Sequence, residues 1–135
     1  MIVATLIMSI AVVGMISGLS GATRNAALLR DYDRVTQLAR LRMNDLVVDP
    51  DFHAGSTIHG DFDRSLAGGL TAGWQASVST FELAPPANRP YIGEMVLERV
   101  VLDTWWMSGR TRRTFRLETL RRRILTQADL AAVGQ

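Results

Sequence analysis

The sequence predicts an α+β protein in which one long N-terminal helix, first transmembrane and then amphipathic, packs on a small antiparallel β-sheet. Three observations predict this fold class. The first 23 residues carry no charge, no proline occurs before Pro50, and three later segments alternate apolar with polar residues. A helix that is apolar all round and then two-sided is typical of a chain leaving a membrane. Alternation is typical of half-buried strands.

Residues 1–23 are expected to form the transmembrane or filament-core half of the helix, because at a rise of 1.5 Å per residue they reach roughly 33 Å. A secretory signal peptide is the alternative, since Ser20-Gly21-Ala22 resembles a cleavage site, but no basic residue precedes the apolar run. Small residues four positions apart favour close helix approach. The expected packing surface in the membrane or filament is Leu6, Ile10, Val13, Gly14, Ile16 and Gly18.

Residues 24–48 are expected to continue the same helix as its amphipathic half. Apolar residues recur at steps of three and four, and the helix should end at Asp49-Pro50 because a residue before proline leaves the helical region. The apolar stripe is the only long one available to cover the sheet. The expected helix–sheet core is Leu28, Tyr32, Val35, Leu38 and Leu46 from the helix, with Trp74, Phe115 and Leu117 from the strands.

Residues 49–135 are expected to form the globular sheet domain, beginning with a loop from Asp49 to Gly73 that is rich in glycine, aspartate and serine. Both histidines lie in this loop among four aspartates, a set that could ligate a divalent cation. The spacing matches neither an EF-hand nor a metalloprotease helix, so we expect a solvated loop with turn-forming aspartates. The set comprises Asp49, Asp51, His53, His59, Asp61 and Asp63.

Three strands follow that loop. The segment from Trp74 to Thr80 alternates, prolines at 85, 86 and 90 interrupt the chain, and Met95 to Met107 alternates again. Ser108-Gly109 predicts a tight turn into a third strand that carries Phe115 and Leu117 on one face. The tail after Thr126 is expected to form a short helix or to fray.

The amino-acid composition excludes several classes of function. The chain has no cysteine, which excludes disulfide scaffolds and thiol nucleophiles. No nucleophile or glycine-rich phosphate loop accompanies the histidines, so we expect no catalytic residue, metal or cofactor. Seven of the 15 basic residues, all arginines, lie between Arg110 and Arg123. Nucleic-acid binding is one interpretation. Strand alternation spreads these arginines over both faces and the net charge is only +2, so we expect a solvated outer face or salt bridges to acidic neighbouring chains.

The chain resembles the type IV pilin-like proteins, and most closely the minor pseudopilins of the I type in type II secretion systems. The resemblance rests on IVATLIMSIAVVGMISGLS, VTQLARLRMNDLVVD, AGWQASVS and the closing pattern VVLDTWWMSGRTRRTFRLETL. It implies a non-enzymatic structural subunit that waits in the bacterial inner membrane as a single-pass protein with a periplasmic domain. Its implied partners are other pseudopilins, with neither nucleic acid nor a small-molecule substrate. The alternatives are a minor pilin of a type IV pilus or competence system, and a single-pass membrane-anchored binding domain.

The sequence departs from the family at its start. The family has a short basic leader, a Gly-Phe or Gly-Met junction that prepilin peptidase cuts and methylates, and a glutamate soon afterwards. If Met1 is the mature first residue, Thr5 stands where the glutamate belongs. The positive-inside rule, applied to Arg24 and Arg30 alone, would place the domain in the cytoplasm. We expect either a leader encoded upstream, which would restore the family orientation, or a divergent copy that is not processed.

Overall fold

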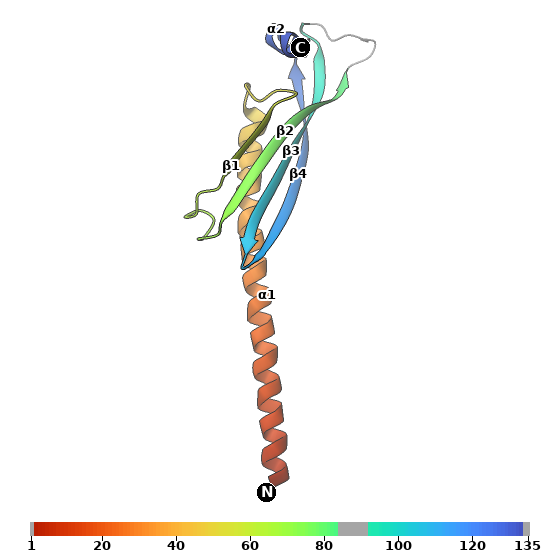
Figure 1. The fold of residues 1–135 in the computed structure, drawn as a ribbon. Coiled ribbons are helices and arrows are strands. Elements are labelled where there is room, and N and C mark those ends of the chain that lie inside the picture. The colour runs from red at the N-terminus through yellow and green to blue at the C-terminus, as the bar shows by residue number, and fades with distance from the viewer. Residues whose placement is uncertain (1, 84–91, 134–135) are drawn as a thin grey trace.

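The computed structural model describes residues 2–83 and 92–133 and confirms the predicted α+β class (Figure 1). The predicted connection through the three prolines lies outside the described residues. The elements are α1 (Ile2–Val48), β1 (Thr57–Asp61), β2 (Ala72–Leu83), β3 (Met95–Ser108), β4 (Thr111–Ile124) and α2 (Gln127–Val133).

The four strands form one antiparallel sheet in the order β1-β2-β3-β4. The predicted hairpin is confirmed: β3 and β4 pair along their whole length, and Gly109 takes a positive φ of 62° in the turn between them. Side chains on alternate positions point to opposite faces of the sheet. Every second residue of β3 from Val96 to Trp106 is buried, which gives the sheet an inner face toward α1.

Helix α1 has the predicted length of 47 residues and ends where Pro50 requires. Just beyond it, the side chain of Asp49 accepts a hydrogen bond of 3.0 Å from the backbone amide of Asp51, which turns the chain away from the helix axis. Figure 1 shows that only the second half of α1 lies against the sheet, while the first half extends away from the domain.

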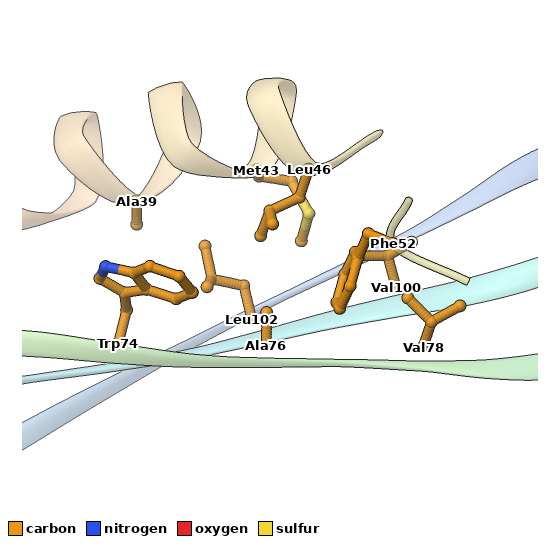
Figure 2. Close-up of a cluster of buried hydrophobic side chains, with 9 residues drawn as sticks. All are labelled: Ala39, Met43, Leu46, Phe52, Trp74, Ala76, Val78, Val100 and Leu102. Atoms are coloured by element: carbon orange, nitrogen blue, oxygen red, sulfur yellow. The ribbon is translucent and has the colours of Figure 1, made fainter. Parts of the chain in front are cut away.

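The main core lies between the second half of α1 and the inner face of the sheet (Figure 2). Residues from the helix, from the segment after it and from β2 and β3 meet there and exclude water. Burial of this apolar surface, at about 25 cal/mol per Å², is the main force that holds the helix on the sheet. The buried members are Ala39, Met43, Leu46, Phe52, Trp74, Ala76, Val78, Val100 and Leu102.

A second, smaller cluster lies nearer the first half of α1. It contains Val35, Ala72 and Trp106. At its rim the ring of Tyr32 makes edge contacts with two aromatic rings, at centroid distances of 5.9 Å to Trp106 and 5.7 Å to Phe115. These contacts mark where the domain begins to cover the helix, because the residues from Ile2 to Ala27 are all exposed.

The prediction of an unbroken loop from Asp49 to Gly73 is wrong for residues 57–61, which form β1. This strand has one apolar residue, Ile58, so its alternation was too weak to read. Its structure comes from pairing with β2, from Thr57 opposite Ser77 to Asp61 opposite Gly73. A Cβ on Gly60 would lie 2.9 Å from the Trp74 ring, so the glycine leaves the room in which that ring packs.

Candidate functional site

The apolar half of α1 is the largest uncovered hydrophobic surface in the described part of the chain. Leu6, Ile10, Val13 and Ile16 are each more than 60% exposed, as the prediction for a single protomer requires. The most apolar 18-residue window of the helix has a mean hydropathy of 2.4, and none of it is buried. By length and composition α1 could cross a membrane. Such a surface is stable only in lipid or against other chains.

Four of the five hydroxyl groups in this half donate hydrogen bonds within the helix itself. The hydroxyls of Ser9 and Ser20 donate to backbone carbonyls four residues earlier, at 2.8 and 2.9 Å, and Thr5 and Thr23 make similar bonds. A polar group without a partner is costly in hydrocarbon. Because these hydroxyls have partners inside the helix, the surface presented to surrounding molecules is effectively apolar.

The two predicted small positions face open space. A Cβ built on Gly14 or Gly18 would meet nothing within 4 Å. These glycines therefore have no packing role inside one protomer. These glycines are predicted to let a helix of a neighbouring molecule approach closely, and this prediction concerns contacts outside the single protomer.

The predicted helix–sheet residues lie at the contact between α1 and the sheet to different extents. Val35, Leu46 and Trp74 are buried. Tyr32 remains 41% exposed, although its ring contacts the second cluster. The residues that are half-buried are Leu28, Leu38, Phe115 and Leu117.

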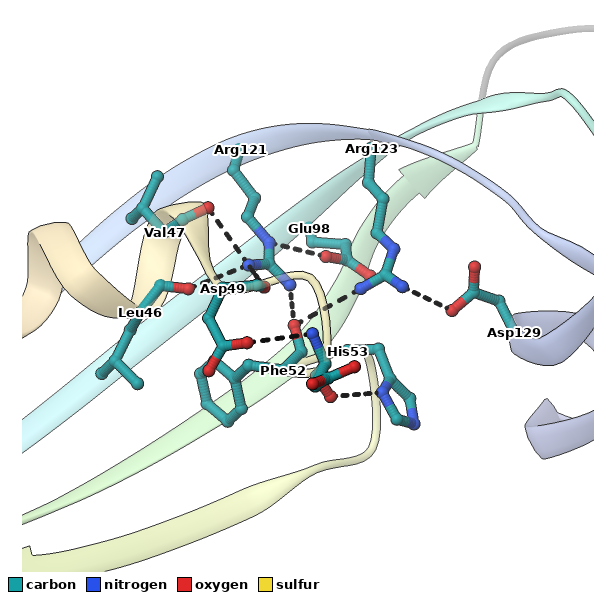
Figure 3. A network of polar contacts seen from close by, with 10 residues as sticks. Leu46, Val47, Asp49, Phe52, His53, Glu98, Arg121, Arg123 and Asp129 are labelled. Carbon is teal, nitrogen blue, oxygen red and sulfur yellow. Dashed lines mark hydrogen bonds and ion pairs between the residues drawn. The ribbon is translucent and has the colours of Figure 1, made fainter.

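A buried polar network, which the sequence analysis did not foresee, joins β4 to the end of α1 (Figure 3). The guanidinium of Arg121 donates from Nε to the Glu98 carboxylate at 2.8 Å. It also donates to the carbonyls of Leu46 at 3.0 Å and Val47 at 3.3 Å. Further bonds reach the carbonyls of Asp49 and Phe52 in the segment that follows.

This network does two things for the helix end. The last carbonyls of a helix lack intrahelical partners and carry the negative end of its dipole, so a cation there is favourable. The charge of Arg121 is balanced by Glu98, and both side chains are at most 7% exposed. One arginine therefore joins the end of α1, the segment after it and the β3–β4 hairpin.

The prediction that the arginines between 110 and 123 occupy a solvated face is wrong for Arg121. Strand parity places it on the inner face with Phe115 and Leu117. A signal for this was available. With Ser108 opposite Thr111 across the turn, antiparallel counting puts Glu98 opposite Arg121, so two opposite charges meet on the face that also carries Val100 and Leu102.

A second polar cluster holds the C-terminal helix α2 against β4. Arg123 donates to Asp129 at 2.9 Å, and Asp129 accepts bonds from the amide and hydroxyl of Thr126 at the start of the helix. Burial alone would raise the pKa of Asp129. The hydrogen bonds from Thr126 and the charges of Arg123 and His53 outweigh it and hold this pKa below its usual value.

The outer face of the sheet carries exposed charged pairs. Arg116 forms a two-pronged ion pair with Asp103, at 2.6 and 2.9 Å, which raises the pKa of Arg116 above its usual value. Beside it, the guanidinium of Arg112 stacks 4.6 Å from the centre of the Trp105 ring. The Trp105 ring in turn lies over Gly73, where a Cβ would approach it to 2.7 Å.

The histidine and aspartate residues of segment 49–63 do not converge in the structure. Across residues 2–83 and 92–133 no group of three His, Cys, Asp or Glu side chains could hold a metal ion. His53 Nδ1 lies 2.7 Å from the carbonyl oxygen of Asp51. Asp63 accepts bonds from the hydroxyl and amide of Ser65, which hold its pKa below the usual value. These groups serve local turns, as in the solvated-loop interpretation.

The first half of α1 is thus apolar and uncovered, and the second half is packed against the sheet of its own domain. Comparisons with models of known families, with curated proteins and with solved structures gave no match.

Proposed function

We propose that this protein is a structural subunit of a pilin-like filament, a minor pseudopilin of a type II secretion system. In this proposal residues 2–23 anchor it in the bacterial inner membrane, and the domain from residue 49 onward stands in the periplasm. The observation that supports the proposal is a single 47-residue helix whose first half is apolar and uncovered while its second half is packed on a sheet.

The physical basis is an exchange of environment for the apolar half. In the membrane this surface contacts lipid, and in a filament it would contact the same surface of neighbouring subunits. Both environments are apolar, so the exchange costs little hydration free energy. Gly14 and Gly18 have open space where a neighbouring helix could approach. The second half of α1 keeps the domain attached throughout, because the Arg121 network joins its end to the sheet.

A cysteine-crosslinking experiment tests assembly directly, because the natural chain has no cysteine. Val13→Cys places a thiol on the uncovered half, and Leu41→Cys places one on an exposed position of the covered half as a matched control. In membranes of the native host, we expect thiol-specific crosslinks to another pilin-like subunit from position 13 and far fewer from position 41.

Two further variants separate assembly from chemistry in the loop. Gly14→Leu should reduce both the position-13 crosslink and secretion by obstructing helix approach, whereas His53→Ala with His59→Ala should leave both nearly intact. A membrane-inserted protein without crosslinks, tolerant of Gly14→Leu, would instead be a single-pass anchored binding domain. Loss of pilus formation or DNA uptake with normal secretion would favour the type IV pilus or competence alternative.

A further inference from the structure

The turn between β3 and β4 carries positive charge without a carboxylate partner. We call residues 108–113 the hairpin tip. It contains Arg110, Arg112 and Arg113, all exposed, and no acidic residue occurs between Asp103 and Glu118. In the part of the chain that the structure describes, none of the three takes part in an ion pair. The hairpin tip is therefore a local concentration of guanidinium groups available to an external anion.

Two contacts establish how β4 runs along α1. The Phe115 ring contacts Tyr32, and six residues later Arg121 donates to the carbonyl of Leu46, which lies fourteen residues after Tyr32. Six strand residues span about 20 Å and fourteen helical residues span about 21 Å. Strand and helix therefore advance side by side in the same direction. Figure 1 shows the hairpin tip beside α1 at the end of the domain nearest the free helix half.

The same rises per residue give the position of the hairpin tip along the axis of α1. Thr111, the first residue of β4, is four residues before Phe115, about 13 Å along the strand toward the apolar half, and Arg110 lies in the turn just before it. Thr23, the last residue of the uncharged segment, is nine residues before Tyr32, about 14 Å along the helix. The domain begins to cover α1 at Leu28, about 6 Å along the helix from Arg24, so the exposed arginine side chains of the hairpin tip lie close to the level at which the uncharged segment ends. If residues 2–23 span a bilayer, this is the level of the lipid headgroups.

We propose that the hairpin tip, together with Arg24, binds anionic phospholipid headgroups while the protein resides in the membrane. This inference rests on the membrane-anchored stage of the proposed function. Guanidinium groups bind phosphate oxygens in two-pronged geometry, and basic residues next to a membrane span are attracted to anionic lipid. A second copy of the hairpin tip is a poor partner because the like charges repel.

The charges around the hairpin tip determine which side of the domain would face the lipid. On α1, Arg30 and Arg34 flank Asp31 and Asp33, so that stretch is close to neutral. Asp61, the last residue of β1, and Asp63 are followed by a single arginine, Arg64. Among the described residues at the domain's lower end, those on the β3–β4 side carry the largest excess of positive charge. Headgroup binding would therefore hold the domain with its hairpin tip on the lipid.

Energy transfer from tryptophan to headgroup-labelled lipid tests the proposal on the full chain. The protein is placed in nanodiscs of phosphatidylcholine, or of phosphatidylcholine with about a third phosphatidylglycerol, each with dansyl-labelled headgroups. Transfer should be about twofold greater in the anionic disc, and about 0.5 M salt should remove the difference by screening. Arg110→Gln with Arg113→Gln should also remove it. The matched control, Arg40→Gln with Arg122→Gln, removes the same charge from exposed sites elsewhere and should preserve the difference.

A separate measurement on the same discs distinguishes the two proposals. A thiol at position 13 should be protected from a water-soluble maleimide if the helix is inserted. Protection together with equal transfer in the two lipids, or with an unaltered difference in the Arg110 and Arg113 variant, overturns headgroup binding and leaves the anchor intact. A fully reactive thiol overturns both the anchor and the headgroup contact.

Discussion

The two halves of α1 share one backbone and one regular conformation, yet their surroundings are opposite. Residues 2–27 are all exposed, whereas Val35, Ala39, Met43 and Leu46 in the second half are buried against the sheet. Leucine occurs in both halves, so the type of side chain does not explain the difference. The first half has no polar face to turn toward water and must find its cover in other molecules. The second half has one apolar stripe, which its own domain covers.

The largest effect is expected where the covered half is joined to the sheet. Arg121→Met should leave Glu98 buried without a counter-charge and the carbonyls at the end of α1 without donors, at a cost of about 3–5 kcal/mol in unfolding free energy. Arg122→Met, at the exposed neighbouring position, should cost less than about 0.5 kcal/mol. Denaturant unfolding of the full chain in detergent, followed by near-UV circular dichroism, measures both. Equal effects would show that the network does not stabilise the domain.

The same substitution in the two halves of α1 sharpens the contrast. Leu46 is 1% exposed and Leu6 is 61% exposed. Leu46→Ala removes apolar contacts and leaves a cavity, so it should cost about 2–5 kcal/mol of domain stability. Leu6→Ala should leave domain unfolding unchanged and act only on assembly. A loss of domain stability in Leu6→Ala would mean that the first half also supports the fold.

A related contrast separates the two faces of the sheet, each of which has a tryptophan ring packed on a glycine. Trp74 over Gly60 is buried, whereas Trp105 over Gly73 is only half-buried. Gly60→Ala forces a locked ring to move and should cost about 1–3 kcal/mol. Gly73→Ala should cost less because Trp105 can shift toward solvent. Thermal unfolding of the two variants decides the order, and an equal or reversed order would contradict the difference in ring confinement.

The smallest effect concerns the attachment of α2. The folded-state pKa of Asp129 is lowered, so its stabilising contribution is complete above the unfolded-state pKa of about 4 and is lost as pH falls through the lower folded-state value. Asp129→Asn should cost about 1 kcal/mol near neutral pH, as expected for a weakened cap. It should also reduce the loss of stability on acidification. Hydrogen exchange of the α2 amides between pH 3 and neutrality measures this, and an unchanged pH profile in the variant would exclude the proposed role of Asp129.

Much of the architecture follows from local patterns in the sequence. The absence of proline before Pro50 predicted the length of α1, and the alternation of residues 95–107 predicted the inner and outer faces of β3. The turn at Ser108-Gly109 predicted where the hairpin closes. These signals are strong because each depends on neighbours in the chain, through helix geometry, strand pleating or the φ of one glycine.

Other features depend on partners that are distant in sequence. Strand β1 has little alternation of its own and forms because β2 offers a free edge. Arginine is usually a surface residue, and the burial of Arg121 is favourable because Glu98 and the carbonyls at the end of α1 are its partners. The attachment of α2 likewise depends on the contact between Arg123 of β4 and Asp129 of α2, which can form only after the chain leaves β4.

Local sequence patterns were enough to predict an uncharged N-terminal helix long enough to cross a bilayer, its amphipathic continuation and the strands that follow. Helix length, hydropathy and strand alternation are local properties, so they can be read without the fold. Three features became clear only from the fold: the burial of Arg121, the pairing of residues 57–61 as β1, and the position of the hairpin tip along α1. Those outcomes depend on register and packing between segments, where the free energy of a side chain is set by what lies opposite it.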